Sequence, residues 1–320
     1  MMTASLPLHG RWATDHARGL DLSGRGHEHI PDPHRPDLEA VDLDHNRLMA
    51  LPDWIADLPG LRFLSAYHND LVEPPHGLGG LTRLEVLNLS ANRLTDLGHS
   101  LDRLTALRML DVGHNPLTTL PVALGSNPDL AYLYASDGRL TDLPDSLSQL
   151  ARLTYLNLAD NHLASLPEWI GDLQSLLELR VSGNRLERLP GELGRLSALR
   201  ELHVLNNRLE ALPLSIGGLT NLRVLGLQGN RLSALPDALG DLTALTDLDL
   251  RFNQLATLPQ TLQRLAALRR LDLRANALKT LPSALVELPS LERLDLRWNP
   301  LGRVPDWVGD LERRGCVVLL

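Results

Sequence analysis

The sequence predicts an α/β solenoid: a right-handed, horseshoe-shaped stack of coils with a parallel β-sheet on its concave face and short 3₁₀ or α turns on its convex face. The first observation behind this prediction is a repeat. One pattern of apolar residues opens at Leu38 and returns every 23 residues, without insertion, up to the copy that opens at Leu291, which makes twelve complete copies. A fixed period of this length is typical of solenoids, in which each unit contacts only its neighbours. The second observation is the order of residues inside each copy.

The first half of each copy predicts a short strand. In the copy that opens at Leu222, Leu225 and Leu227 stand at positions 4 and 6, whereas positions 3, 5 and 7 vary between copies. Apolar residues at every second position indicate a strand with one buried face. Position 9 is asparagine in eleven of the twelve copies, from Asn46 to Asn299. Because the chain turns away from the strand there, we expect the amide to satisfy buried backbone groups that would otherwise be unpaired.

The second half of each copy predicts a short turn on the outer face. It opens with Leu235 and Pro236 in the same copy and continues with Leu239 and Leu242, three or four residues apart. Proline suits the start of a helical turn. One coil buries too little apolar surface to offset the conformational entropy that it loses. We therefore expect each coil to be stable only against its neighbours.

The repeat divides the chain into three segments. Residues 1–37 are expected to form an N-terminal cap and a degenerate first repeat, and residues 38–313 hold the twelve regular repeats. Residues 314–320 are expected to add a half-repeat strand, with Val317 and Leu319 pointing inward.

The copy that opens at Leu130 departs most from the pattern. Gly138 replaces its asparagine, and Asn127, just before this copy, replaces a core leucine. One interpretation of both departures is structural drift, which weakens the ladder of asparagine hydrogen bonds and favours a local kink. The other is a functional role.

Charge and cysteine content restrict the class of partner. A net charge of −8 and a pI near 5.8 argue against general binding to nucleic acid or to an anionic membrane. The one cysteine, Cys316, excludes an internal disulfide framework and favours a reducing compartment. The first residues contain no apolar core of signal-peptide length, and no apolar run approaches the ~18 residues of a membrane span. We therefore expect a cytoplasmic protein.

Lysine usage is a further unusual feature. Lys279 is the only lysine among 31 basic residues. One interpretation is a GC-rich genome, which favours arginine codons. The other is delivery into a host cell, where lysine would be a target for ubiquitination.

The aromatic residues indicate a candidate binding surface. Positions 3, 5, 7 and 8 are expected to face outward along the strands. Both Phe residues and all four Tyr residues of the chain stand at these positions. Aromatic residues are enriched at binding interfaces and hot spots, although a preference for strands explains part of the bias. The expected protein-binding anchors are Phe63, Tyr67, Tyr132, Tyr134, Tyr155 and Phe252.

A second candidate zone, near the C-terminal end, combines acidic and basic residues on one face. Aspartate at position 5 is followed two residues later by arginine in three successive copies: Asp249 and Arg251, Asp272 and Arg274, Asp295 and Arg297. One interpretation is a lattice in which the two columns neutralise each other. The other is a docking zone, in which the arginines and Trp298 bind acidic side chains of a protein partner.

Motifs of catalysis and metal binding are missing from the sequence. It has no phosphate-binding loop, nucleophile elbow, HExxH or paired CxxC motif. Cys316 lies in an apolar run without a nearby base, which indicates a core residue rather than a nucleophile. His45 and His68 share position 8 near Asp44, but the spacing fixes no third ligand. We therefore expect no enzymatic activity, no cofactor and no bound metal.

The consensus LxxLxLxxNxLxxLPxxLxxL resembles the 23-residue class of leucine-rich repeats found in bacterial proteins and in plant and animal Ras-group proteins. The resemblance covers about nine tenths of the chain. It implies a cytoplasmic, signalling or effector-like scaffold that binds a protein through its concave face. Two alternatives are the substrate-targeting part of an effector-type ubiquitin ligase or kinase whose catalytic domain lies outside this chain, and a structural or self-associating protein. We expect a monomer or a weak dimer formed through the terminal strand.

Overall fold

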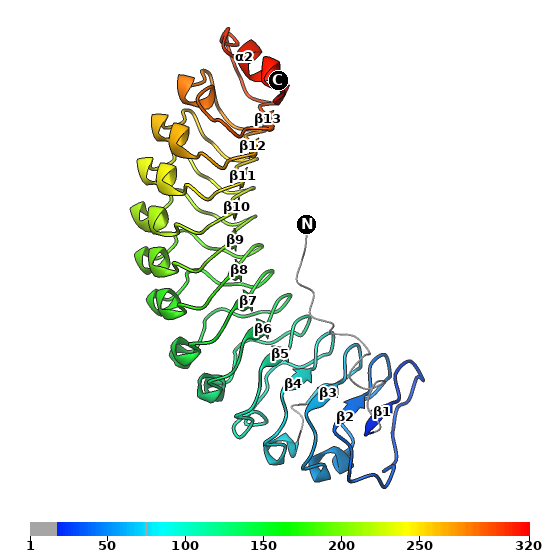
Figure 1. Cartoon of the computed structure of the whole chain (residues 1–320). Helices are drawn as coiled ribbons and strands as arrows, with labels where there is room; N and C mark the ends of the chain where they lie inside the picture. Colours follow the sequence, from blue (N-terminus) through cyan, green and yellow to red (C-terminus); the bar gives the residue numbers. More distant parts are fainter. Residues whose placement is uncertain (1–17, 74–75) are drawn as a thin grey trace. The chain divides into compact units, whose positions relative to one another are not determined.

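The computed structural model describes residues 18–73 and 76–320, so most of the expected N-terminal cap lies outside the described residues. The chain divides into two compact units, Met1–Leu153 and Thr154–Leu320. In each unit the strands line one side of the coils and the 3₁₀ turns line the opposite side (Figure 1). Each unit is therefore a stretch of α/β solenoid, as the repeat predicts.

The strands are three residues long and follow one another in chain order, with parallel pairing and a register of one repeat. In the first unit they are β1 (Gly19–Asp21), β2 (Ala40–Asp42), β3 (Phe63–Ser65), β4 (Val86–Asn88), β5 (Met109–Asp111) and β6 (Tyr132–Tyr134). In the second unit they are β7 (Tyr155–Asn157), β8 (Glu178–Arg180), β9 (Glu201–His203), β10 (Val224–Gly226), β11 (Asp247–Asp249), β12 (Arg270–Asp272), β13 (Arg293–Asp295) and β14 (Val317–Leu319).

The outer side consists almost entirely of 3₁₀ turns. The first unit has η1 (Asp53–Asp57), η2 (Leu78–Gly80), η3 (Val122–Ser126) and η4 (Asp145–Gln149). The second unit has η5 (Glu168–Asp172), η6 (Gly191–Arg195), η7 (Leu214–Gly218), η8 (Asp237–Asp241), η9 (Gln260–Arg264), η10 (Ser283–Leu285) and one α-helix, α2 (Val308–Arg313). Among the described residues, no helix has the length and apolar character needed to cross a membrane.

The core is built as the repeat predicts. In the copy that opens at Leu222, the side chains of Leu225, Leu227 and Leu239 are 0% exposed. Pro236 precedes η8 with φ −71° and ψ 149°, so the proline directs the extended chain into the turn instead of forming its first residue. Each copy therefore buries the leucines of its strand and its turn.

The asparagine at position 9 connects neighbouring coils through backbone hydrogen bonds. The Asn207 side-chain oxygen accepts a hydrogen bond from the Leu186 N–H at 3.0 Å. Its Nδ2 group donates to the carbonyl oxygens of Val181 at 2.9 Å, Leu205 at 3.1 Å and Val204 at 3.3 Å. Equivalent bonds recur at Asn184. Each buried amide of this kind is therefore bonded both to the backbone of its own coil and to the backbone of the preceding coil.

The irregular copy, which opens at Leu130, lacks the asparagine that accepts this hydrogen bond from the preceding coil. Because Gly138 offers no side-chain acceptor, the Leu117 N–H donates instead to the backbone oxygen of Asn115, at 2.7 Å. Asn127 is 1% exposed in the position of a core leucine. Its Nδ2 group donates to the Leu124 oxygen at 3.3 Å, but its Oδ1 atom has no hydrogen-bond partner within the described part of the chain. One poorly satisfied amide therefore lies in the apolar core just before this copy.

We expect Asn127→Leu to stabilise the protein by about 1–2 kcal/mol, because it removes an unpaired buried oxygen and restores the leucine of the repeat. The gain is smaller than the sum of both effects, since leucine is larger than asparagine and the core must adjust. The midpoint of urea unfolding measures the change, and Asn127→Ala is the control that removes the amide without adding apolar contact. Equal or lower stability of the leucine variant relative to wild type would contradict this account.

The last strand corrects the sequence-based register. Val318 pairs with the buried Leu294, while Val317 pairs with Arg293 and is 52% exposed. The prediction that Val317 and Leu319 point inward is therefore wrong by one residue. The reason is that the final coil contains α2 in place of a 3₁₀ turn, so 24 residues instead of 23 separate the paired strand positions Arg293 and Val317.

Cys316 lies next to this strand and is 5% exposed. Burial raises the pKa of its thiol, which opposes formation of a reactive thiolate. The structure therefore gives this cysteine a core environment.

Candidate functional site

The candidate site lies on the strand face of the second unit. We define the strand face as the outward side chains at positions 3, 5, 7 and 8 of each copy. Since the strands pair with a register of one repeat, the same position in successive copies forms a column. The repeat thus places side chains that are 23 residues apart in sequence beside one another.

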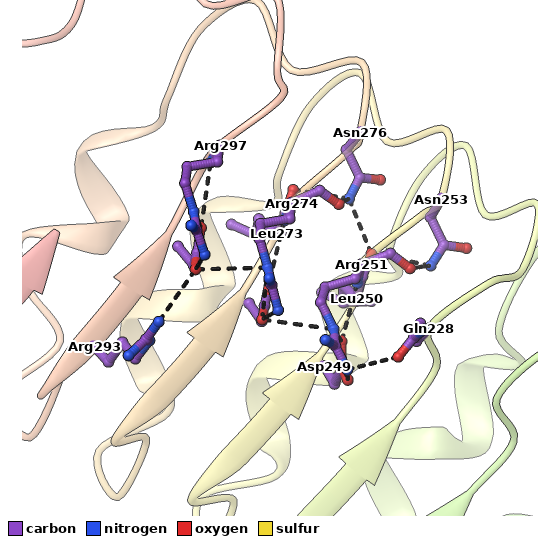
Figure 2. A network of polar contacts seen from close by, with 12 residues as sticks. Gln228, Asp249, Leu250, Arg251, Asn253, Leu273, Arg274, Asn276, Arg293 and Arg297 are labelled. Carbon is purple, nitrogen blue, oxygen red and sulfur yellow. Dashed lines mark hydrogen bonds and ion pairs between the residues drawn. The ribbon is translucent and has the colours of Figure 1, made fainter. Parts of the chain in front are cut away.

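The acid and base columns form a continuous ladder of ion pairs (Figure 2). Arg251 binds both carboxylate oxygens of Asp249, with Nε to Oδ1 at 2.9 Å and Nη2 to Oδ2 at 2.7 Å. It also donates to Gln228 Oε1 at 2.6 Å. Arg274 binds Asp272 in the same two-point geometry, at 3.0 and 2.7 Å. Two-point contacts between guanidinium and carboxylate groups are among the strongest polar contacts in proteins.

Further contacts connect one rung of the ladder to the next. Arg251 Nε lies 3.6 Å from Asp272 Oδ2, and Arg274 Nε lies 3.5 Å from Asp295 Oδ2. Arg297 closes the ladder with bonds of 2.9 and 2.7 Å to Asp295. These geometries match the interpretation of two columns that neutralise each other.

The pKa shifts agree with this arrangement. Burial alone would raise the pKa of Asp295, whose side chain is 1% exposed, but its hydrogen bonds with Arg297 and the arginine charges hold that pKa below the ordinary value. The hydrogen bond with Asp249 raises the pKa of Arg251, and the one with Asp272 raises that of Arg274. The arginines of the ladder are therefore already engaged with aspartates, and these contacts favour the charged form of each guanidinium group.

Two large aromatic side chains stand beside the ladder and are not covered by it. Phe252 is 48% exposed and Trp298 is 66% exposed, and their ring centroids lie 6.2 Å apart. The Arg297 guanidinium carbon lies 5.8 Å from the Trp298 ring centroid, within the range of a cation–π contact. We call Phe252 and Trp298 the aromatic pair.

The backbone of the aromatic pair is unusual for such side chains. Position 8 has positive φ in every one of the twelve copies, including 54° at Phe252 and 64° at Trp298. Glycine, asparagine and aspartate tolerate this left-handed conformation best, and bulky residues adopt it at a cost. Gly229 and Ala275 fill the same position in the copies on either side of Phe252, and Ala275 is also in the copy before Trp298. The two aromatic residues therefore occupy a strained position without the compensation of burial.

A shallow hollow of about 290 Å³ opens beside the ladder, where Gly226 leaves a gap in the column of position 5. A Cβ atom at Gly226 would lie 2.8 Å from Cδ1 of Leu205, so the absence of a side chain lets Leu205 lean across the strand. Val224 and Leu205 are half-buried at this hollow, while Asp247 and Arg270 line its rim. The strand face thus has an apolar depression next to its charged zone.

The other predicted anchors have different surroundings. Phe63 is only 3% exposed and packs against Ala40 and Val86, so the expectation that it is an exposed anchor is corrected: its neighbours at position 3 are apolar and cover it. Tyr67 is half-buried, with its ring centroid 5.1 Å from that of His45. The remaining tyrosines are half-buried on the strand face of their own units: Tyr132 and Tyr134 in the first unit, and Tyr155 in the second.

The N-terminal strands also hold one perturbed carboxylate. Asp42 is 3% exposed and accepts a hydrogen bond from the Asp44 N–H at 2.9 Å. Burial, helped by the nearby charges of Asp44 and Asp21, raises the pKa of Asp42 to about 6. These strands therefore present a face of different chemistry from the ion-paired ladder of the second unit.

Comparisons with known proteins agree with this architecture. A family model described as a leucine-rich repeat region matches residues 144–255 and 214–313, and a second leucine-rich repeat model matches residues 74–117. The chain belongs to the leucine-rich repeat family. No match was found among the curated proteins.

Two solved structures illustrate the likeness. A leucine-rich repeat protein of Leptospira interrogans is 33% identical with a TM-score of 0.84, and the alignment covers 89% of this chain and 73% of that one. The plant peptide hormone receptor RGFR1, solved in complex with RGF2, is 28% identical with a TM-score of 0.78. That alignment covers 89% of this chain and 48% of the receptor, so the chain spans about half the length of the receptor structure.

Two features of the strand face were missed by sequence reasoning. The hollow depends on Gly226 and on the side-chain direction of Leu205, and neither residue breaks the leucine pattern. The second feature is a group of two glutamates and a histidine on β8 and β9: Glu178, Glu201 and His203. Writing the repeats in register would have aligned the two glutamates, because both stand at position 3 of adjacent copies.

Proposed function

We propose that this protein is a non-catalytic recognition scaffold that captures a protein partner through the strand face of its second unit, with the aromatic pair as anchors. The observation that carries the proposal is the exposure of Phe252 and Trp298 at left-handed backbone positions. Strained residues in proteins cluster at binding and active sites, where their position serves an interaction. Tryptophan and other large aromatic residues are also the side chains most enriched at interface hot spots.

The ladder supports the proposal by fixing the surroundings of the anchors. Arg251 and Arg274 are 28% and 20% exposed and are held by two-point bonds, so little side-chain entropy remains to be lost when a partner covers them. The ladder provides a rigid polar border, which is the usual arrangement around a hydrophobic hot spot. The arginines are therefore border residues in this proposal, and the aromatic pair supplies most of the affinity.

The comparisons support a polypeptide as the class of ligand. The similar plant receptor is described as a peptide hormone receptor in complex with RGF2. A net charge of −8 also disfavours polyanionic ligands such as nucleic acid. We further propose a cytoplasmic location, which rests on the buried, unpaired Cys316.

We expect the double variant Phe252→Ala, Trp298→Ala to bind the native partner about a hundredfold more weakly, since each anchor contributes roughly 1–2 kcal/mol or more. Its thermal stability should be nearly unchanged, because the removed rings are exposed. The measurement compares proteins captured from the native cell by the wild type and by the variant, followed by titration of the captured protein.

Leu214→Ala is the matched control, because Leu214 is 77% exposed but lies on η7, on the turn side of the coils. Capture should survive this change. The proposal is wrong if the double variant captures the same protein with wild-type affinity. If binding instead disappears with salt and with Arg251→Gln while the double variant binds normally, the partner docks on the arginines and the aromatic pair has no role.

A further inference from the structure

Glu178, Glu201 and His203 form a compact group on the strand face, away from the aromatic pair. Glu178 on β8 pairs in register with Glu201 on β9, and His203 stands two residues after Glu201 on the same face. One ligand atom from each residue can be chosen so that all three lie within 4.8 Å of one another. All three side chains come from short, parallel, rigid strands within one unit, so their mutual placement is set by the sheet.

The spacing suits a small metal ion. His203 Nε2 lies 3.1 Å from Glu201 Oε2. Two ligands that bind zinc at about 2.0–2.2 Å with tetrahedral angles lie roughly 3.3–3.5 Å apart, so this pair is only slightly closer than ligand spacing. A carboxylate oxygen of Glu178 lies within 4.8 Å of both ligand atoms of the pair, and rotation of the glutamate side chain can bring it closer.

The charge of the group is unbalanced without a cation. Two carboxylates stand side by side at opposed strand positions, an arrangement that is unfavourable for like charges. Arg180 donates from Nε to Glu178 Oε1 at 2.5 Å, which offsets one of the two carboxylate charges and leaves the charge of Glu201 in contact with the His203 ring. A divalent cation bound to the free carboxylate oxygens and the neutral imidazole would offset this charge.

The hollow at Gly226 leaves space for coordination. A Cβ atom at Gly226 would lie 3.5 Å from His203 Nδ1, at ordinary contact distance, and His203 lines the hollow that opens at this glycine. The side chains of Glu178 and His203 are 22% and 21% exposed, which indicates partial shielding from water with an open side. Three protein ligands with an open position are the arrangement of exchangeable zinc sites.

We propose that Glu178, Glu201 and His203 bind one divalent transition-metal ion of the zinc type, beside the ion pair between Arg180 and Glu178. An imidazole ligand favours zinc, cobalt and nickel over magnesium and calcium, which prefer oxygen alone. The open coordination positions would hold water or a donor atom of a bound ligand. The site stands on its own contacts and does not depend on the aromatic pair.

Zinc binding measured by calorimetry tests the site, with the absorption spectrum of bound cobalt as a second readout of imidazole ligation. The parent protein for the test is His45→Asn, His68→Asn, because those two rings lie 5.0 Å apart and could bind zinc separately. In that background we expect one zinc ion per chain, with no heat from magnesium at the same concentration. His203→Asn and Glu201→Gln should each weaken zinc binding at least about tenfold and change the cobalt spectrum.

Two further variants distinguish specific binding of zinc by these three ligands from non-specific attraction of cations to an acidic protein. Arg180→Gln should tighten zinc binding, because it removes a positive charge beside Glu178 and leaves the three ligands in place. His162→Asn, in the same unit, should leave the affinity unchanged. No zinc binding in the parent protein, equal affinity in His203→Asn, or an equal loss in His162→Asn would each overturn the proposal.

Discussion

Replacing Asn207 by alanine is expected to destabilise the second unit by about 2–4 kcal/mol. The amide is 7% exposed and makes four hydrogen bonds to backbone groups of two coils. Without it, the Leu186 N–H has no partner at a buried position, and a buried donor left unsatisfied costs about 1–3 kcal/mol. The carbonyl oxygens of Val181 and Val204 keep bonds to Asn184 and Asn230 of the same ladder, which limits the remaining loss.

Urea unfolding followed by far-UV circular dichroism measures this effect. Asn221→Ala is the control, because Asn221 is exposed and donates a single hydrogen bond to the Ser197 oxygen, at 2.8 Å. It should change the stability by less than about 1 kcal/mol. Hydrogen exchange should also increase for the amides of the coils on either side of Asn207, since each coil is stabilised by its neighbours. Similar losses from the two alanine variants would show that the ladder has no special role.

Most of the fold was predictable because each copy of the repeat forms the same short strand, turn and buried apolar positions. The apolar residues at positions 4 and 6 must be buried in each copy, and the structure buries Leu225 and Leu227 completely. The prediction failed where the period ended. The last coil closes with α2, and the extra residue shifted the register so that Val318 became the inward residue. Sequence periodicity cannot reveal an insertion at the end of the final copy, because no later copy shows the shift.

The candidate site was predictable to a lesser extent, since the repeat fixes which column a residue joins but not what covers it. The pairing of Asp249 with Arg251 followed from their positions, and the observed contacts match it. The burial of Phe63 did not follow, because it depends on apolar neighbours in other copies. The backbone strain at Trp298 could not be predicted from the alternation of apolar residues along the strand. Position 8 lies just beyond the strand, where φ becomes positive.

A second large effect is expected on the outer side of the coils, where glycine at position 19 allows close packing. We expect Gly194→Ala to destabilise the protein by about 3 kcal/mol. A Cβ atom at Gly194 would lie 2.2 Å from the backbone oxygen of Ser215 in the next turn, far inside contact distance. Backbone cannot rotate away as a side chain can, so the coils must separate or distort, and overpacking of this kind costs about 1–3 kcal/mol or more.

Gly191→Ala is a closely matched control, because Gly191 lies in the same turn, η6, three residues earlier. A Cβ atom there would have no neighbour within 4 Å, and its φ is not positive. The expected change is neutral or a gain of up to about 1 kcal/mol, because alanine reduces the entropy of the unfolded chain. The difference between the two variants in urea midpoint therefore isolates the steric contact from the loss of glycine flexibility. Equal midpoints would mean that the turns of η6 and η7 can move apart without loss, and that the outer packing contributes little to the stability of the stack.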